Sequence, residues 1–306
     1  MNKKDLIKVY PITPDLKLLN IGTSIPGYGN FLGAYLLCGE KNILIDVGPQ
    51  ATIPNLLSAL AESNVNPQQI DYIILTHIHI DHAGGIGAAI REMSKARVLA
   101  HSRARPHLID PSKLWEASLS TLGDMAIKYG NIEPVPEDRI IVATDLMKLD
   151  IGCGIMLEIH FTPGHASHHL SLFDRAHGLL IAGETAGVCI DGSIRPATPP
   201  PFKMEETLHS LDRLIALKPE QLCYGHFGCY DNATERLKLM KQKILEWHKI
   251  INSAAKSGKH QEEILSILRK QDNNLDYLNN LDRDTYQREH LLLINDINGL
   301  CDSYST

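Results

Sequence analysis

The sequence has no long apolar run and few cysteines. None of its apolar segments approaches the roughly 18 residues of a membrane-spanning helix. The 6 cysteines of the 306-residue chain form no Cys-x-x-Cys pair, and their spacing suggests no disulfide framework. Residues 1–6 are charged with no apolar stretch behind them, so we expect no signal peptide. These absences predict a cytoplasmic protein with reduced thiols and no membrane partner.

The sequence also lacks a surplus of basic charge. Lys and Arg number 30 against 36 Asp and Glu, which gives a formal charge of −6, and no basic cluster stands out. A broad nucleic-acid-binding face needs a local basic surplus, so we expect no nucleic-acid partner. A small-molecule substrate is the expected partner. The sequence leaves the oligomeric state open, with a homodimer as one option.

Short apolar runs alternate with amphipathic segments over the first three quarters of the chain. Strands are predicted at residues 16–21, 31–38, 43–46, 71–76, 97–101, 156–161, 169–173, 179–182 and 221–224. Helices are predicted at 54–62, 87–93 and 204–217, with a single helix at 112–129. Strands followed by helices occur twice, which indicates a layered α/β domain with two sheets.

The chain changes character near residue 230, after which no strand-like run occurs. Apolar residues recur at helical spacing, namely Leu237, Met240, Ile244, Trp247 and Ile251. Asn232 and Glu235 resemble a capping box at the start of this helix. We therefore predict a catalytic domain at 1–230 and a helical extension at 231–306. The extension either packs on the core alone or also covers the active site.

Histidine is abundant, and it is the commonest metal ligand in proteins. Of the 15 His, ten lie between His77 and His177. Directly after the predicted strand at 71–76, four potential ligands follow within six residues: His77, His79, Asp81 and His82. His77 and His79 point to the same side in an extended segment. Imidazole and carboxylate groups together suit Zn²⁺, and also Fe or Mn.

Three more predicted strands end in a potential ligand. His165 follows the strand at 156–161, Glu184 follows 179–182, and His226 follows 221–224. Each position alone is weak evidence, because a histidine at a strand end is usually a hydrogen-bonded polar residue. Four such strand ends in one chain indicate a metal site.

The order and spacing of these motifs resemble the metallo-β-lactamase superfamily of hydrolases, over residues from about 16 to 230. The resemblance implies an αββα sandwich with the metal site at one edge of two sheets. It assigns His77, His79 and His165 to a first metal ion and Asp81, His82 and His226 to a second. It also gives Asp46 a structural role in orienting the metal-binding loop, and it suggests that His169 supports a ligand and is not one.

Glu184 departs from the family pattern, which usually has aspartate as the bridging carboxylate. The longer side chain leaves three alternatives open: Glu184 bridges two metals, binds one, or binds none. The resemblance implies two divalent cations, with Zn²⁺ as the leading candidate and Fe or Mn as alternatives.

The implied activity is that of a metal-dependent hydrolase. A hydroxide bridging the two metals attacks a small carbonyl substrate such as a thioester, lactone or ester, and Asp81 is the catalytic residue that orients it. Glyoxalase II and acyl-homoserine-lactone lactonases share these motifs. The alternatives are a phosphodiesterase, a mononuclear iron enzyme like the persulfide dioxygenases, and a regulatory module that retains a metal. Arg103, Arg105 and Arg195 are interpreted as solvated surface residues, with anchoring of a substrate anion as the alternative.

Overall fold

The structure is a computed structural model that describes residues 7–226 and 228–302. Residues 1–6, on which the expected absence of a signal peptide depends, lie outside this range. The chain divides into two compact units. The first contains residues up to 161 together with 172–177, and the second contains 162–171 and the chain from 178 onward.

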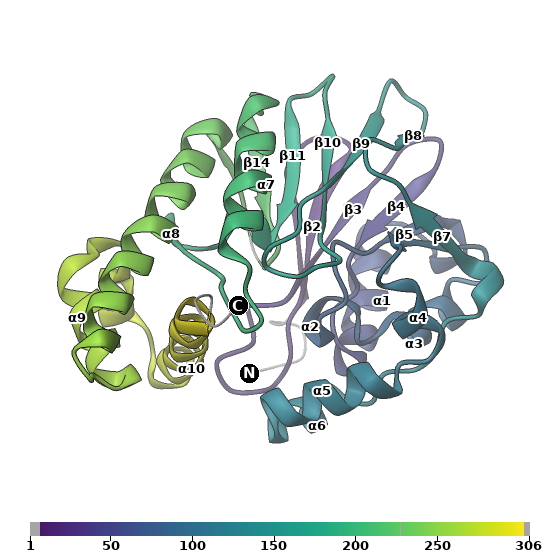
Figure 1. The fold of residues 1–306 in the computed structure, drawn as a ribbon. Coiled ribbons are helices and arrows are strands. Elements are labelled where there is room, and N and C mark those ends of the chain that lie inside the picture. Colours follow the sequence, from purple (N-terminus) through teal and green to yellow (C-terminus); the bar gives the residue numbers. More distant parts are fainter. Residues whose placement is uncertain (1–6, 227, 303–306) are drawn as a thin grey trace. The chain divides into compact units, whose positions relative to one another are not determined.

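The first unit is built on one large sheet. Among the described residues, seven strands follow one another in chain order across it (Figure 1). They are β1 (Ile7–Pro11), β2 (Leu16–Ile21), β3 (Gly33–Leu37), β4 (Asn42–Ile45), β5 (Ile70–Ile74), β6 (Arg97–His101) and β7 (Ile140–Ala143). Strands β1 to β4 pair antiparallel, whereas β4 to β7 pair parallel. The ends of β4 and β5 therefore meet at one edge of the sheet.

Helices and a second strand pair complete the first unit. The helices are α1 (Ile53–Glu62), α2 (Ile80–Ala83), α3 (Ile86–Glu92), α4 (Arg105–Ile109), α5 (Ser112–Leu122) and α6 (Asp124–Tyr129). Strand β8 (Lys148–Asp150) pairs antiparallel with β9 (Met156–Phe161), and residues 172–174 of β10 (Leu170–Asp174) also belong to this unit. The prediction of one helix at 112–129 was wrong. Gly123 adopts a φ of 53°, which ends α5 before α6 begins.

The second unit begins with strands and ends with helices. Strand β11 (Leu179–Gly183) pairs parallel with β14 (Gln221–Tyr224), which pairs antiparallel with β15 (Cys229–Asp231). Strands β12 (Val188–Ile190) and β13 (Ser193–Arg195) form a small antiparallel ribbon. Helix α7 (Met204–Ala216) follows.

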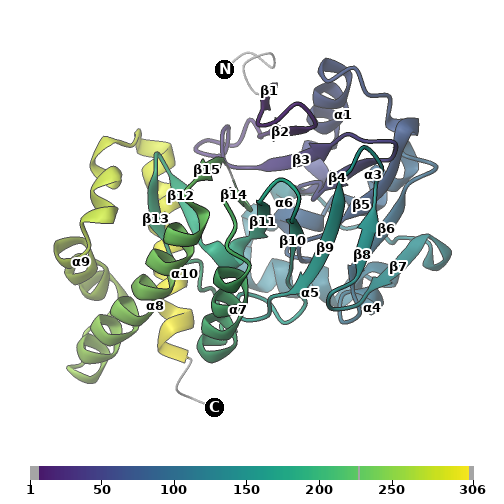
Figure 2. The ribbon, with the colours of Figure 1, turned by 90° about the horizontal axis from the view of Figure 1, so that it is seen from above.

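The C-terminal part of the second unit is helical, as predicted. It comprises α8 (Ala233–Lys256), α9 (Gln261–Gln271), the 3₁₀ segment η6 (Asn273–Asn280) and α10 (Arg283–Asp302). Helix α8 packs against α7, α9 and α10 (Figure 2). All five residues of its predicted apolar stripe are buried. The capping box was a wrong interpretation, because Asn232 has a left-handed φ of 60° and its side chain makes no capping hydrogen bond.

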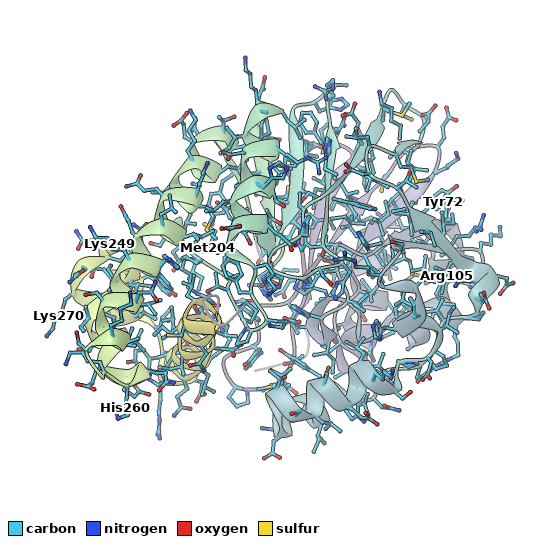
Figure 3. All side chains as sticks on the ribbon, viewed as in Figure 1. Tyr72, Arg105, Met204, Lys249, His260 and Lys270 are labelled. Atoms are coloured by element: carbon cyan, nitrogen blue, oxygen red, sulfur yellow. The ribbon has the colours of Figure 1, made fainter. Side chains whose placement is uncertain are left out.

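The predicted α/β class with C-terminal helices is confirmed, and the boundary at residue 230 stays a prediction. Exposed polar side chains such as Lys249, His260 and Lys270 lie on the outer side of the C-terminal helices (Figure 3). None of the helices in the described ranges is long and apolar enough to cross a membrane. All six cysteines lie in those ranges, and none takes part in a disulfide bond.

Candidate metal centre

The first unit places its potential ligands at the carboxyl ends of two neighbouring parallel strands. Asp46 comes directly after β4, and His77 comes three residues after the end of β5. His79 precedes the first turn of α2, and Asp81 and His82 lie on that helix. The ends of parallel strands are where open α/β sheets usually bind ligands.

Asp46 organises this loop in the way that the resemblance implies. Its Oδ1 atom accepts a hydrogen bond from the backbone N–H of Thr76 at 2.8 Å. Its Oδ2 atom accepts one from the Thr76 hydroxyl at 2.8 Å and one from Nδ1 of His82 at 2.9 Å. The backbone N–H groups of Val47 and Gly48 also donate to the His82 carbonyl oxygen. The loop is thus tied to the strand ends at several points.

These bonds determine which ring nitrogens carry a proton. Because Asp46 only accepts, the Nδ1 proton of His82 is donated to it, and the lone pair lies on Nε2. The Thr76 hydroxyl also donates to Asp46, so it accepts from Nδ1 of His77, 3.1 Å away. The lone pair of His77 then lies on Nε2, which is 3.0 Å from Nδ1 of His79. Nε2 of His82 similarly faces Oδ2 of Asp81 at 3.9 Å. The first pair shares a proton or a cation, and the second pair, which joins a lone pair to a carboxylate, can attract a cation.

The second unit brings together Glu184, His165 and His226. Glu184 follows β11 and His226 follows its parallel neighbour β14, and the N–H of Gly225 donates to the carbonyl oxygen of Gly183. Oε2 of Glu184 lies 2.8 Å from Nε2 of His165, and Oε1 lies 3.0 Å from Nε2 of His226. All three of these side chains are buried.

The charges of this second group require compensation. Nδ1 of His165 donates to the carbonyl oxygen of Ala197 at 3.0 Å, so Nε2 faces the Glu184 carboxylate with a lone pair or a second proton. Burial alone raises the pKa of Glu184, but the positive charges of protonated His165 and His226 hold that pKa well below 4.5. A divalent cation supplies the same positive charge without those protons. The donor chemistry of both groups therefore fits a metal ion.

His169 behaves as a supporting residue, as the sequence suggested. Its Nε2 atom accepts a hydrogen bond from the backbone N–H of Glu184 at 3.1 Å. Its Nδ1 atom lies 2.8 Å from the hydroxyl of Thr162 and 3.2 Å from that of Thr185. Both ring nitrogens thus make contacts within the protein, and these contacts position Glu184.

One arginine that the sequence predicts to lie at the surface is buried. Arg195 is only 2 % exposed and forms ion pairs with Glu289 and Asp296 on α10, so its interpretation as a surface residue was wrong. The partners lie about a hundred residues further along the chain, and no local pattern around Arg195 points to them. Arg103 is exposed as expected, and Arg105 pairs with Glu137 near the surface.

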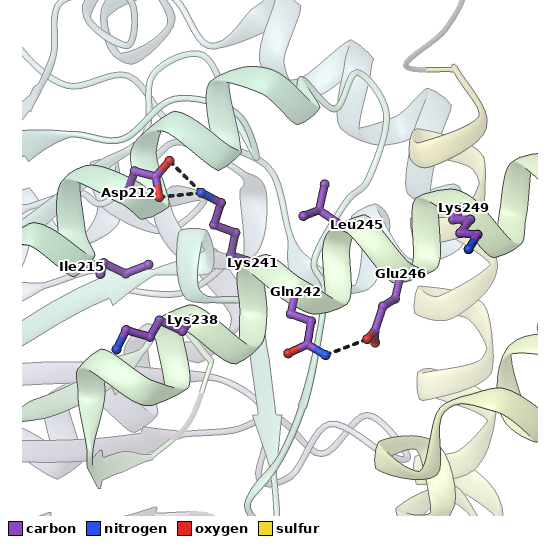
Figure 4. Close-up of a pocket in the computed structure, with 8 residues that line it drawn as sticks. All are labelled: Asp212, Ile215, Lys238, Lys241, Gln242, Leu245, Glu246 and Lys249. Atoms are coloured by element: carbon purple, nitrogen blue, oxygen red, sulfur yellow. Dashed lines mark hydrogen bonds and ion pairs between the residues drawn. The ribbon is translucent and has the colours of Figure 1, made fainter.

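A surface pocket between α7 and α8 contains no comparable ligand set. Its lining consists of Asp212, Ile215, Lys238, Lys241, Gln242, Leu245, Glu246 and Lys249 (Figure 4). The ammonium group of Lys241 is paired with both carboxylate oxygens of Asp212, at 2.6 and 2.7 Å. The pocket therefore offers no cluster of histidine and carboxylate ligands, and the strand ends remain the candidate site.

The chain has an α/β fold and presents histidine and carboxylate side chains, which are potential metal ligands, at the carboxyl ends of parallel strands. The metallo-beta-lactamase superfamily model matches residues 34–226, and the chain belongs to this superfamily. Metallo-beta-lactamase fold-containing protein ST1585 of Sulfurisphaera tokodaii is 33% identical over 219 residues, which are 70% of this chain and 76% of that protein.

Solved structures extend the similarity beyond the matched segment. The structure of ST1585 superposes with a TM-score of 0.73 at 26% identity and covers 95% of this chain and 100% of that one. TTHA1429 of Thermus thermophilus has the same fold, with a TM-score of 0.69 at 22% identity over 95% of this chain and 93% of its own. The predicted metallo-β-lactamase-like fold is thus confirmed. Hydroxyacylglutathione hydrolase of Aeromonas hydrophila is 25% identical over 60% of this chain and 55% of its own.

Proposed function

We propose that the chain is a hydrolase in which both ligand groups bind the same pair of divalent cations, with Zn²⁺ as the leading candidate. The proposed ligands are His77, His79, Asp81 and His82 of the first unit and His165, Glu184 and His226 of the second. Membership of the superfamily supports the union of the two groups. A bound pair of such cations lowers the pKa of water to about 7 and polarises a carbonyl oxygen.

The observation that carries the proposal is the geometry of Glu184. Its two oxygens each face a different histidine, at 2.8 and 3.0 Å. The superfamily pattern assigns these histidines, His165 and His226, to different metals. A carboxylate with one oxygen directed at each is placed to bridge two cations, although it is one CH₂ longer than the usual aspartate.

The surrounding residues prepare the ligands for this task. Asp46 and Thr76 fix the tautomers of His82 and His77, so that Nε2 of each ring carries the lone pair. Asp81 is more accessible than its neighbours, with 23% of its side chain exposed. We assign it the catalytic role, because its carboxylate can accept a hydrogen bond from an attacking water molecule and orient it.

The proposed substrate is a small carbonyl compound, with a thioester, a lactone or another ester as the candidates. Support comes from the Aeromonas relative, whose name gives an acyl-glutathione substrate. A cytoplasmic location is proposed with it, on the basis of six cysteines that form no disulfide bond.

The first test is elemental analysis of protein expressed with both zinc and iron available. About two metals per chain are expected, together with turnover of a thioester or a lactone, but not of a phosphodiester, in a panel that contains all three. About one iron per chain would contradict the bridging role of Glu184 and would favour a mononuclear iron enzyme.

His79→Ala and Asp81→Ala should each abolish turnover, whereas His209→Ala, which changes an exposed histidine on α7, should not. Full activity of either ligand variant would overturn the proposal.

A further inference from the structure

A buried arginine connects the last helix to the segment that follows β13. Arg195 donates from Nε to Oε2 of Glu289 at 3.0 Å and from Nη1 to Oδ2 of Asp296 at 2.8 Å. Nη1 also donates to the carbonyl oxygen of Pro196 at 3.1 Å. All three charged side chains are at most 5% exposed. Burying charged groups costs free energy, so each charge in the cluster needs an ion-pair or hydrogen-bond partner.

Asp296 also binds the backbone of Thr198 directly. Its Oδ1 atom accepts a hydrogen bond from the Thr198 N–H at 2.6 Å, and its carbonyl oxygen accepts one from the Thr198 hydroxyl at 2.9 Å. Helix α10 lies against this segment without a gap, because a Cβ atom at Gly299 would come within 1.8 Å of the Thr198 carbonyl oxygen. The position of the segment is therefore determined by α10.

The N–H group of Thr198 and the carbonyl group of Ala197 belong to one peptide unit. This unit is trans, so the two groups point in opposite directions. The Ala197 carbonyl oxygen accepts the Nδ1 proton of His165 at 3.0 Å. An anion that accepts from the N–H end of a peptide unit increases the negative charge on its oxygen, and hydrogen bonds in such a chain strengthen one another.

We propose that Asp296 is a positioning residue for His165 and acts through the Ala197–Thr198 peptide unit. The inference rests on the proposed metal binding. Asp46 supports His82 by direct contact, and Asp296 supports His165 through one intervening peptide group. In both cases a buried carboxylate fixes the imidazole tautomer and increases the basicity of Nε2. Carboxylates that support metal-binding histidines change metal affinity by about 10- to 100-fold when they are removed.

The test compares Asp296→Asn with Glu289→Gln. Both substitutions remove a buried negative charge that pairs with the Arg195 cluster. The hydrogen bonds of Glu289 go to Arg195, Tyr277 and Arg288, and none of these bonds reaches the 196–198 segment. The affinity for Zn²⁺ is measured by competition with a chromophoric chelator, and thermal unfolding of the metal-free proteins is measured in parallel. Assays at about pH 8 keep Asp296 ionised, because burial raises its pKa to about 7 against the attraction of Arg195.

We expect both variants to lose stability, but only Asp296→Asn to bind Zn²⁺ about 10- to 100-fold more weakly. The Nδ1 proton of His165 should also shift upfield in the NMR spectrum of this variant.

Wild-type affinity in Asp296→Asn, or an equal loss in Glu289→Gln, would overturn the inference. If Asp296→Asn does not fold, Thr198→Pro serves instead, because proline lacks the N–H that donates to Asp296. This variant should weaken binding in the same direction, whereas unchanged affinity would overturn the inference. A wild-type chain that binds no divalent ion would overturn the proposed function itself.

Discussion

The carboxylate of Asp46 lies 2.9 Å from Nδ1 of His82, although the two residues are 36 positions apart in the sequence. Both are buried. The contact depends on the parallel pairing of β4 and β5, which brings the segments after these two strands together. It fixes the imidazole so that Nε2 points away from the carboxylate, toward Asp81.

Asp46→Asn should therefore weaken Zn²⁺ binding by about 10- to 100-fold. Asparagine tolerates the left-handed φ of 58° at this position, so the substitution removes the charge without distorting the backbone. The measurement is chelator competition. Asp174→Asn is the matched control, because the buried Asp174 also pairs with a histidine, the exposed His177, at 2.5 Å, and neither residue is a proposed ligand. Equal affinity in both variants would show that Asp46 has no role in metal binding.

Glu184 should determine the number of bound metals. We expect Glu184→Gln to reduce the metal content from about two per chain to about one, because a neutral amide is a weak ligand. Glu184→Asp, which restores the usual family residue, should retain both. Elemental analysis after dialysis measures the content directly. Two metals in Glu184→Gln would mean that this carboxylate is not a bridge.

Removal of metal should lower the thermal stability of the wild-type protein. A ligand present at 100 times its Kd stabilises a folded protein by about 2.7 kcal/mol. We expect a chelator to decrease the melting temperature reversibly, and Zn²⁺ to restore it. The wild type and Glu184→Gln should differ in this response, since the variant loses one of its metals. An unchanged melting temperature would contradict tight binding.

Asp272 should stabilise the C-terminal helices in a pH-dependent manner. It accepts hydrogen bonds from Lys243 at 2.6 Å and from Trp247 at 2.8 Å, and all three residues are buried. Burial opposes its charge, but these hydrogen bonds hold its pKa below the ordinary 3.8. The stabilisation is therefore complete above pH 3.8 and is lost as the pH falls through the lower pKa of the folded state.

Asp272→Asn should reduce the free energy of unfolding by about 3–5 kcal/mol at neutral pH, because it leaves Lys243 buried without its counterion. Asp212→Asn, which breaks the more exposed pair with Lys241, should cost at most about 1 kcal/mol. Urea unfolding at neutral pH and below pH 3.8 distinguishes the two. A difference between wild type and Asp272→Asn that does not diminish at low pH would contradict the assignment.

The apolar stripe of α8 can be tested with two adjacent residues. Ile244 is fully buried, whereas Leu245 is 46% exposed. Ile244→Ala should destabilise the protein by about 2–5 kcal/mol because it leaves a cavity. Leu245→Ala should change the stability by about 0.5 kcal/mol or less. Similar losses in urea unfolding would mean that α8 is packed differently.

The sequence predicts best where local patterns and burial agree. The strand at 97–101 and the helix at 204–217 were predicted almost to the residue, because apolar periodicity dominates there. The potential ligands within each unit were identified from their places after apolar strands. The break at Gly123 was missed, because a glycine inside a helical pattern does not reveal whether its φ is positive.

The remaining errors concern contacts that are distant in sequence. Arginine is usually a surface residue, and the burial of Arg195 depends on two acidic groups of α10. Asn232 looked like a capping residue because of its spacing to Glu235, but its backbone conformation makes a cap impossible. Neither outcome can be read from neighbours in the chain, because tertiary packing decides both.

The contact between Thr198 and Asp296 spans 98 residues and involves the last described helix. During synthesis on the ribosome, His165 is therefore made long before the residue that supports it. Nascent chains that end before α10 lack the partners of Arg195 and Thr198, so we expect them to bind metal weakly. If Asp296 has the proposed role, the chain reaches its full metal affinity only after α10 has been made and has packed against residues 196–198.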